Sequence, residues 1–265
     1  MIAAGPFRTF EVSDPELEME GLRHVTVHSP ALRSRADLTL WVPEAAGPLP
    51  IVVLMHGVYG SHWLWAHKAG VHRTAARLVA SGQIAPMVLA MPSDGLWEDG
   101  SGYLALPDRD VESWIIDEVP LAVELAVPGA SAAAGLCLAG LSMGGWGALR
   151  LGALHHDKVL AVSGLSSNTA LSQLDDMTAT SLGDVGELGD LLVASNRLPQ
   201  LRFDCGTDDA FIEANRRLHQ QLEREKVAHT YQENPGGHEW SYWAEHIATT
   251  LVFFSEALTA SHSGS

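Results

Sequence analysis

Short apolar runs recur along this chain from residue 51 onward, and each is followed by a stretch with the spacing of an amphipathic helix. A run that is apolar at every position fits a strand buried on both faces, as in a parallel sheet covered by helices on both sides. The runs span residues 51–55, 87–91, 136–141, 159–162 and 201–205, with a further strand expected at 229–232. Helices are expected at 66–81, 111–126, 145–155, 211–226 and 239–258. The pattern predicts an α/β fold with a mostly parallel central sheet and helices on both faces.

Residues 1–50 follow a different pattern. Apolar and other residues alternate at 7–11, 22–27 and 38–42. Alternation is typical of strands with one exposed face, so antiparallel edge strands are expected here. A chain of 265 residues, of which 46% are hydrophobic, can bury one sizeable core. We therefore expect a single domain over residues 1–265, with a disordered tail at 260–265.

The charge balance narrows the classes of partner. Acidic residues number 32 against 16 basic ones, which gives a formal net charge of −16. Such a chain repels nucleic-acid phosphates and anionic lipid surfaces. It also contains no apolar run of the roughly 20 residues that span a bilayer and no basic and apolar leader. The sequence predicts a cytoplasmic protein that binds neither nucleic acid nor membrane. It is also compatible with a homo-oligomer.

Two cysteines, Cys137 and Cys205, lie inside apolar, strand-like runs. A free cysteine in such a setting behaves as a small buried hydrophobic residue. We expect both to be structural thiols rather than a disulfide or metal ligands.

The sequence Gly140-Leu141-Ser142-Met143-Gly144 joins an expected strand to an expected helix. In this context GxSxG is typical of a tight turn that holds a nucleophilic serine in a strained backbone conformation. Glycines two positions before and after the serine avoid collisions with neighbouring backbone. The helix N-terminus then offers the Met143 N–H to an oxygen that becomes negative during acyl transfer.

An acid and a base follow in the chain order that a serine triad requires in an α/β-hydrolase, Ser, then Asp or Glu, then His. Asp208 and Asp209 come directly after the run 201–205, at the carboxyl end of an expected strand. Either could orient the base, and the other would cap the helix that follows. Among 13 histidines, only His238 combines a late position, a Gly-rich strand-to-helix loop and the required order.

A second oxyanion donor is expected in the loop after residues 51–55, which reads His56-Gly57-Val58-Tyr59-Gly60. The N–H of Val58 is the first choice and that of Tyr59 the alternative. Most of the eight tryptophans are expected in the core. Side chains that follow strand ends are better placed to line a substrate pocket, and these are Tyr59, Trp63, Trp65 and Trp97.

Four motifs together resemble the putative-esterase family of α/β-hydrolases, over residues 20–258. They are Leu54-Met55-His56-Gly57, Gly140-Leu141-Ser142-Met143-Gly144-Gly145, Cys205-Gly206-Thr207-Asp208-Asp209 and Gly236-Gly237-His238-Glu239-Trp240. This family includes S-formylglutathione hydrolase (esterase D), tributyrin and feruloyl esterases, and the antigen 85 mycolyltransferases. The resemblance implies a serine carboxylesterase that acts on short-chain or small acyl esters without any cofactor. It also implies Asp209 as the acid and Val58 as an oxyanion donor.

Three alternatives stay open at this stage. One is a thioesterase of the S-formylglutathione type, or an acyltransferase, with the same fold. Another is a catalytically inactive α/β-hydrolase that serves as a binding module. The third is a metal-dependent hydrolase or binding protein that uses His62, His67 and His72. Their spacing of five residues does not place three ligands on one face of a helix, so no metal is expected.

Overall fold

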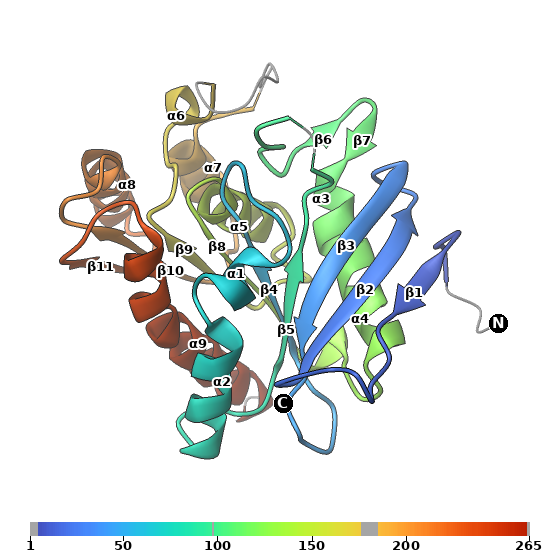
Figure 1. Ribbon diagram of the computed structural model, residues 1–265. Helices are drawn as coiled ribbons and strands as arrows, with labels where there is room; N and C mark the ends of the chain where they lie inside the picture. Colours follow the sequence, from blue (N-terminus) through green and yellow to red (C-terminus); the bar gives the residue numbers. More distant parts are fainter. Residues whose placement is uncertain (1–4, 97, 176–184, 264–265) are drawn as a thin grey trace.

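The computed structural model describes residues 5–96, 98–175 and 185–263. Within these residues, nine strands form one sheet in the order β1-β2-β3-β5-β4-β8-β9-β10-β11 (Figure 1). Their bounds are β1 Phe10–Val12, β2 Leu22–Ser29, β3 Ser34–Trp41, β4 Ile51–Met55, β5 Val88–Pro92, β8 Leu136–Leu141, β9 Ala161–Leu165, β10 Gln200–Gly206 and β11 Thr230–Asn234. A separate hairpin pairs β6 (Ala105–Leu106) with β7 (Arg109–Asp110).

The sheet divides into two parts by strand direction. Strands β5, β4, β8, β9, β10 and β11 run parallel to one another. Strands β1, β2 and β3 pair antiparallel and join the edge of β5. The predicted parallel sheet with antiparallel N-terminal edge strands is therefore confirmed.

Helices cover both faces of the sheet (Figure 1). One face is covered by α1 (Leu64–His67), α2 (Val71–Ala80) and α9 (Trp240–Ser263). The other face is covered by α3 (Val111–Ser113), the π-helical turn η1 (Trp114–Glu118), α4 (Val119–Ala126), α5 (Met143–Leu154), α7 (Leu188–Ala194) and α8 (Ile212–Arg224). The short elements η2 (Ala132–Ala134) and α6 (Leu171–Asp175) lie in the connections.

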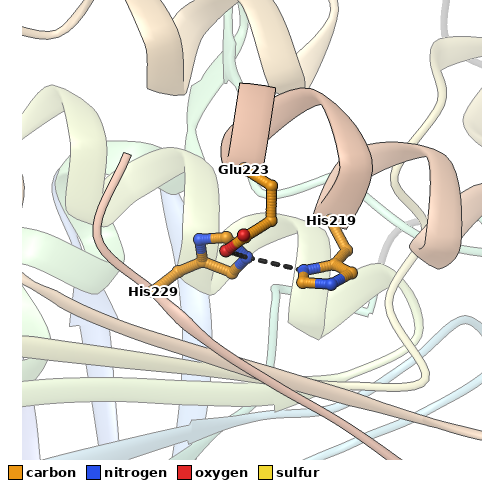
Figure 2. A group of neighbouring side chains, drawn as sticks. All are labelled: His219, Glu223 and His229. Atoms are coloured by element: carbon orange, nitrogen blue, oxygen red, sulfur yellow. Dashed lines mark hydrogen bonds and ion pairs between the residues drawn. The ribbon is translucent and has the colours of Figure 1, made fainter. Parts of the chain in front are cut away.

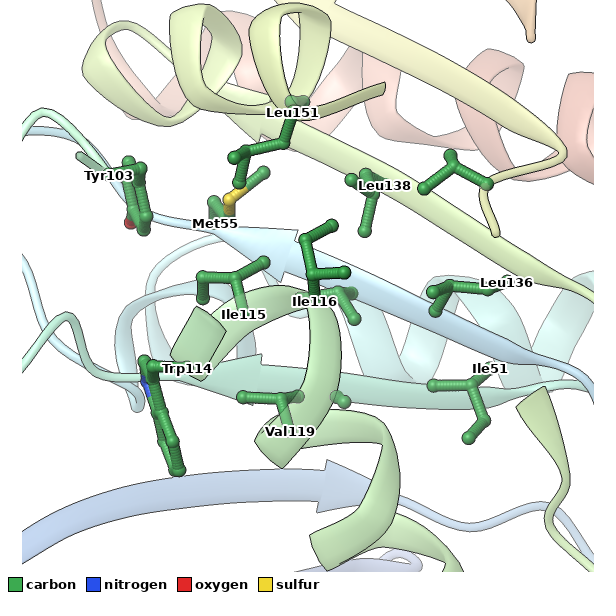
Figure 3. Close-up of a cluster of buried hydrophobic side chains, with 14 of the residues drawn as sticks. Ile51, Met55, Tyr103, Trp114, Ile115, Ile116, Val119, Leu136, Leu138 and Leu151 are labelled. Carbon is green, nitrogen blue, oxygen red and sulfur yellow. The ribbon is translucent and has the colours of Figure 1, made fainter. Parts of the chain in front are cut away.

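The central strands are apolar throughout because each face packs into a different core. In β4, Ile51 and Met55 point into the cluster beneath α4 and α5, while Val52 and Leu54 belong to the cluster beneath α2 and α9. Figure 3 shows part of the first of these, with Met55 near Ile116 of η1 and Ile51 at the other end of the strand. Burial of aliphatic side chains on both faces contributes about 1.5–3 kcal/mol for each residue, which fixes the strand at the centre.

Several element boundaries differ from those expected. The helix predicted at 66–81 is divided into α1 and α2 at Gly70, whose φ of 62° cannot continue a right-handed helix. The strand predicted at 159–162 lies at Ala161–Leu165. The last helix extends to Ser263, so residues 260–263 are helical rather than part of a disordered tail. In this last part of the helix, Thr259 Oγ1 donates to the Ser255 carbonyl at 2.8 Å.

The polar segment that follows β9 is partly buried. Ser166, Ser167 and Asn168 have no exposed surface, whereas Glu187 and Asp190 lie in the solvent-facing part. Residues 176–184 are outside the described part of the chain. In the described part, no helix has both the length and the apolar character needed to cross a bilayer.

Candidate active site

Ser142 stands in the turn between β8 and α5, at the carboxyl edge of the sheet. Its backbone has φ 52° and ψ −120°, a strained conformation for a residue with a side chain. The two glycines of the motif are required by close approach. A Cβ on Gly140 would lie 2.2 Å from the Gly144 carbonyl oxygen, and a Cβ on Gly144 would lie 2.5 Å from that of Met55. The turn therefore has the geometry that the sequence motif predicted.

The hydroxyl of Ser142 meets the imidazole of His238, which lies in the loop between β11 and α9. Ser142 Oγ and His238 Nε2 are 3.1 Å apart, and His238 Nδ1 is 2.9 Å from Asp209 Oδ2. Because a carboxylate only accepts, Nδ1 carries the hydrogen and Nε2 presents its lone pair to the serine hydroxyl. The three side chains thus form one continuous chain of hydrogen bonds.

The loops that carry the acid and the base are joined by their backbones. The N–H of Thr207 donates to the carbonyl of Asn234 at 2.9 Å, and the N–H of Asp208 donates to that of Gly236 at the same distance. These bonds extend the pairing of β10 and β11 past the strand ends. The Asp209–His238 contact is therefore fixed by backbone pairing as well as by the side chains.

The structure distinguishes the two adjacent aspartates. Asp209 is buried and faces His238, whereas Asp208 is exposed. Capping of α8 was expected from the aspartate that does not contact the base. Instead, Asp209 Oδ1 accepts the N–H of Phe211, the residue before α8, at 2.8 Å. The predicted side-chain cap of α8 is therefore wrong, and the two oxygens of Asp209 bind the base and the backbone of the turn that leads into α8.

Burial acts to raise the pKa of Asp209, but the hydrogen bonds from His238 and from the Phe211 N–H outweigh it and hold the pKa below its ordinary value. The carboxylate is therefore ionised at neutral pH and can stabilise a positive charge on His238.

Two backbone N–H groups border the serine. Met143 is the first residue of α5, so its N–H has no carbonyl acceptor within the helix. On the other side, the loop after β4 passes close to the serine, since a Cβ on Gly57 would lie 3.3 Å from Ser142 Cβ. The N–H of Tyr59 already donates to the Asp99 carbonyl at 2.7 Å. The geometry therefore favours Val58 over Tyr59 as the second oxyanion donor.

The loop after β4 is held by His56. Its Nδ1 donates to the Gly57 carbonyl at 2.7 Å, and its Nε2 accepts the N–H of Asp94 at 3.3 Å. Tyr103 donates its hydroxyl hydrogen to the His56 carbonyl at 2.9 Å. These bonds fix the path of the residues that follow, including Val58.

Two aromatic rings hold His238 edge-on. The ring of Phe211 is 4.7 Å from that of His238, and the ring of Trp243 is 5.0 Å away, both in T-shaped arrangements. Neither residue was predicted from the sequence to belong to the site. Phe211 lies two residues after Asp209 and Trp243 five residues after His238, so proximity in sequence to the acid and base was the available signal.

Asn168 is a further residue that the sequence analysis missed. Its Oδ1 lies 3.3 Å from Ser142 Oγ and is an alternative acceptor for the single hydroxyl hydrogen, at a longer distance than His238 Nε2. Because the preceding strand was predicted to end at 162 rather than at Leu165, Asn168 was not recognised as a residue near a strand end.

The predicted pocket residues have different positions. Tyr59 is 76% exposed and Trp63 is 43% exposed, so both stand at the surface rather than in an enclosed pocket. Trp65 is buried in the core, where its Nε1 donates to the Met55 carbonyl, so its assignment to the pocket is wrong. Trp97 lies outside the described residues. The role of Tyr59, Trp63 and Trp97 in substrate binding stays a prediction.

The three histidines considered as metal ligands have separate surroundings. His62 Nδ1 is hydrogen-bonded to Thr39 at 2.8 Å, and His72 Nε2 contacts Glu20 at 2.8 Å. His67 is exposed at the end of α1. Within the described residues, these side chains do not gather around a common point.

The chain matches the model of one protein family and is similar to several known esterases. The model of the family described as "Putative esterase" matches residues 29–254. The acetyl esterase of Caldicellulosiruptor saccharolyticus is 24% identical over 236 residues, which cover 78% of this chain and 84% of the relative.

Solved structures resemble the chain over nearly its whole length. A ferulic acid esterase has a TM-score of 0.78 at 24% identity and covers 94% of this chain and 100% of its own. The S-formylglutathione hydrolase of Staphylococcus aureus has a TM-score of 0.72 at 19% identity, with coverage of 92% and 98%. These likenesses confirm the predicted α/β-hydrolase fold.

Proposed function

This chain belongs to the putative-esterase family, and from that premise we propose that Ser142, His238 and Asp209 are the catalytic triad of its carboxylesterase activity. The chain is a serine hydrolase that acts on carboxylic esters. One observation supports this assignment of residues. Ser142 lies at the N-terminus of α5, and a continuous chain of hydrogen bonds runs from its Oγ through His238 to Asp209.

The first half of the reaction forms an acyl-enzyme. His238 Nε2 takes the proton of Ser142 as Oγ attacks the ester carbonyl carbon. The carbonyl oxygen becomes negative and receives hydrogen bonds from the N–H groups of Val58 and Met143. The tetrahedral intermediate then collapses, the C–O bond to the alcohol breaks, and His238 gives its proton to the departing alkoxide. The acyl group is left on Ser142.

The second half releases the acid. His238 takes a proton from water, and the resulting hydroxide attacks the acyl carbon. The bond to Ser142 Oγ breaks, and His238 returns the proton to the serine. Asp209 stays ionised through both halves and stabilises the imidazolium form of His238.

Short or small acyl groups suit this site. The loop around Gly100 is pressed against the nucleophile turn, because a Cβ on Gly100 would lie 2.5 Å from Met143 Sδ and 3.2 Å from Val58 Cγ1. This close packing beside the two proposed oxyanion residues supports a preference for short or small acyl groups. The exposed side chains of Tyr59 and Trp63 are available for the alcohol part of the substrate.

The test is a series of p-nitrophenyl esters from acetate to decanoate, with thioesters of the same acyl groups run in parallel. We expect kcat/KM to be highest for the shortest acyl groups and to fall as the chain lengthens. A preference for thioesters would favour the S-formylglutathione-type alternative, and transfer to an added alcohol in place of water would favour an acyltransferase. Binding of esters without turnover would indicate the inactive binding module.

Three further properties stay predictions. The chain is expected to behave as a single domain, to be located in the cytoplasm, and to be able to form a homo-oligomer. Limited proteolysis, cell fractionation and light scattering of the purified protein test them in turn.

A further inference from the structure

Two histidines and a glutamate meet at the end of the sheet opposite to Ser142. His219 and Glu223 lie four residues apart on α8, and His229 lies in the link between α8 and β11. Their potential ligand atoms all lie within 4.8 Å of one another. Within the described residues, this is the group of histidine and acidic side chains that could share a metal ion. Figure 2 shows the two imidazoles facing each other with the carboxylate of Glu223 beside them.

The hydrogen bonds around His229 prepare it as a ligand. Its Nδ1 is 2.7 Å from the Val227 carbonyl oxygen, which can only accept, so Nδ1 carries the hydrogen. Its Nε2 therefore presents a lone pair, and His219 Nδ1 lies 2.8 Å from that atom. A histidine that donates one ring N–H to a backbone carbonyl and offers the other nitrogen is the arrangement found at protein metal sites.

Neighbouring rings hold both imidazoles in place. His219 stacks on Tyr231 with 4.7 Å between ring centroids, and His229 stacks on Phe203 at 5.7 Å. The side chain of His229 is 1% exposed, while that of Glu223 is 65% exposed. The cluster thus has two nitrogen atoms held by ring stacking on the protein side and one exposed carboxylate on the solvent side, from which an ion can enter.

We propose that His219, Glu223 and His229 bind one zinc-type divalent transition-metal ion, with water as the fourth ligand. Donor atoms around tetrahedral zinc lie about 2.0–2.2 Å from the metal and hence about 3.3 Å from one another. The present separations bracket that value, with 2.8 Å between the two nitrogens and 4.0 Å between His229 Nε2 and Glu223 Oε1. Binding requires the single ring hydrogen of His219 to move from Nδ1, where it is shared with His229 Nε2, to Nε2, so that both facing nitrogens present lone pairs to the ion.

The position of the site indicates a structural role. His229 directly precedes β11 and His238 follows it, so the strand, about 16 Å long, separates the metal from the catalytic base. The ion would tie the C-terminal turn of α8 to the start of β11. These two elements follow Asp209 and precede His238 in the chain, so the metal would stabilise the unit that holds acid and base together.

The test uses tag-free protein freed of metal with a chelator. Calorimetric titration with Zn²⁺ should give one equivalent bound, and the Tm should rise with Zn²⁺ but not with Mg²⁺, which prefers oxygen ligands. Replacing Zn²⁺ with Co²⁺ should give the visible absorption of a tetrahedral centre.

Three variants and one control locate the ion. We expect Glu223→Gln, His219→Gln and His229→Gln each to weaken Zn²⁺ binding at least tenfold, whereas His67→Ala should bind like the wild type. If His229→Gln fails to fold, Glu223→Gln still decides the matter because its side chain is largely exposed. The proposal is overturned if the wild type binds no Zn²⁺, or if Glu223→Gln and His219→Gln bind it with unchanged affinity and stoichiometry.

Discussion

Asp209 holds His238 with one carboxylate oxygen and the start of helix α8 with the other. Oδ2 is 2.9 Å from His238 Nδ1, and Oδ1 accepts the Phe211 N–H at 2.8 Å. Rotation of the carboxylate would break one of these bonds, so the beginning of α8 sets the orientation of the base. The same helix positions the Phe211 ring against the imidazole.

Replacing Asp209 with asparagine should lower kcat by about 10⁴-fold, as loss of the orienting aspartate does in a serine protease triad. The asparagine carbonyl can still accept the Phe211 N–H, but its NH₂ then faces His238 Nδ1. That contact favours a hydrogen on Nε2, which can no longer accept the proton of Ser142. Steady-state kinetics with p-nitrophenyl acetate, together with the Tm, measures the effect.

Asp208→Asn is the matched control for this change. Asp208 is exposed, and its backbone rather than its side chain joins the loop of His238. Activity within about twofold of the wild type is expected, since substitutions at such surface positions have small effects. A large loss in Asp208→Asn with little loss in Asp209→Asn would reverse the assignment of the acid.

Gly57→Ala tests the oxyanion donor that we assign to Val58. The new Cβ would lie 2.9 Å from Leu141 Cδ1 and 3.3 Å from Ser142 Cβ, which pushes the loop away from the serine. Loss of one oxyanion hydrogen bond costs about 10²–10³-fold in kcat, and KM should change little. Gly186→Ala, at an exposed position with no atom within 4 Å of the new Cβ, is the control. Full activity in Gly57→Ala would argue against this donor.

The rings beside His238 should affect turnover more than stability. Aromatic pairs of this kind contribute about 0.5–1.5 kcal/mol beyond area burial, so Phe211→Leu should lower kcat by about 2–10-fold while KM stays unchanged. Phe10→Leu removes a similar ring contact, with Phe7, far from the site and should leave kcat intact. Equal effects of the two variants on kcat would show that Phe211 does not position the base.

Both cysteine thiols should be unreactive in the native protein. Burial raises the pKa of Cys137 to about 12 and, with the nearby charges of Asp209 and Asp204, also raises that of Cys205. Ellman's reagent at pH 8 should therefore detect both free cysteines only after denaturation. Because the fold keeps protons that the unfolded chain releases above about pH 9, the free energy of unfolding should fall in that range. Rapid labelling of the native protein would contradict this view of the thiols.

Much of the architecture could be predicted from the sequence because it depends on local patterns. The strand of Ile51–Met55 is apolar at each position since its alternate side chains enter two cores. The turn at Ser142 could be predicted because only glycine fits at positions 140 and 144. Chain order, the late position and the Gly-rich strand-to-helix loop together then reduced the choice of base to His238.

Other features depend on contacts between distant segments and leave little signal in the sequence. Asn168 reaches Ser142 because β9 begins and ends later than its apolar run suggests. The choice between Asp208 and Asp209 depends on how the loop turns after β10. His229 meets His219 only because the link after α8 folds back at that point, and no helical spacing relates the two.

The most direct test of the central claim is to locate the covalent adduct formed by an organophosphonate. Wild-type protein, Ser142→Ala and His238→Gln are treated with the reagent, and intact mass, peptide mapping and residual esterase activity are measured together. We expect one adduct on Ser142, lost activity in proportion to labelling, and no adduct or turnover in Ser142→Ala. An adduct on another residue, or ester hydrolysis that persists in Ser142→Ala, would contradict the account.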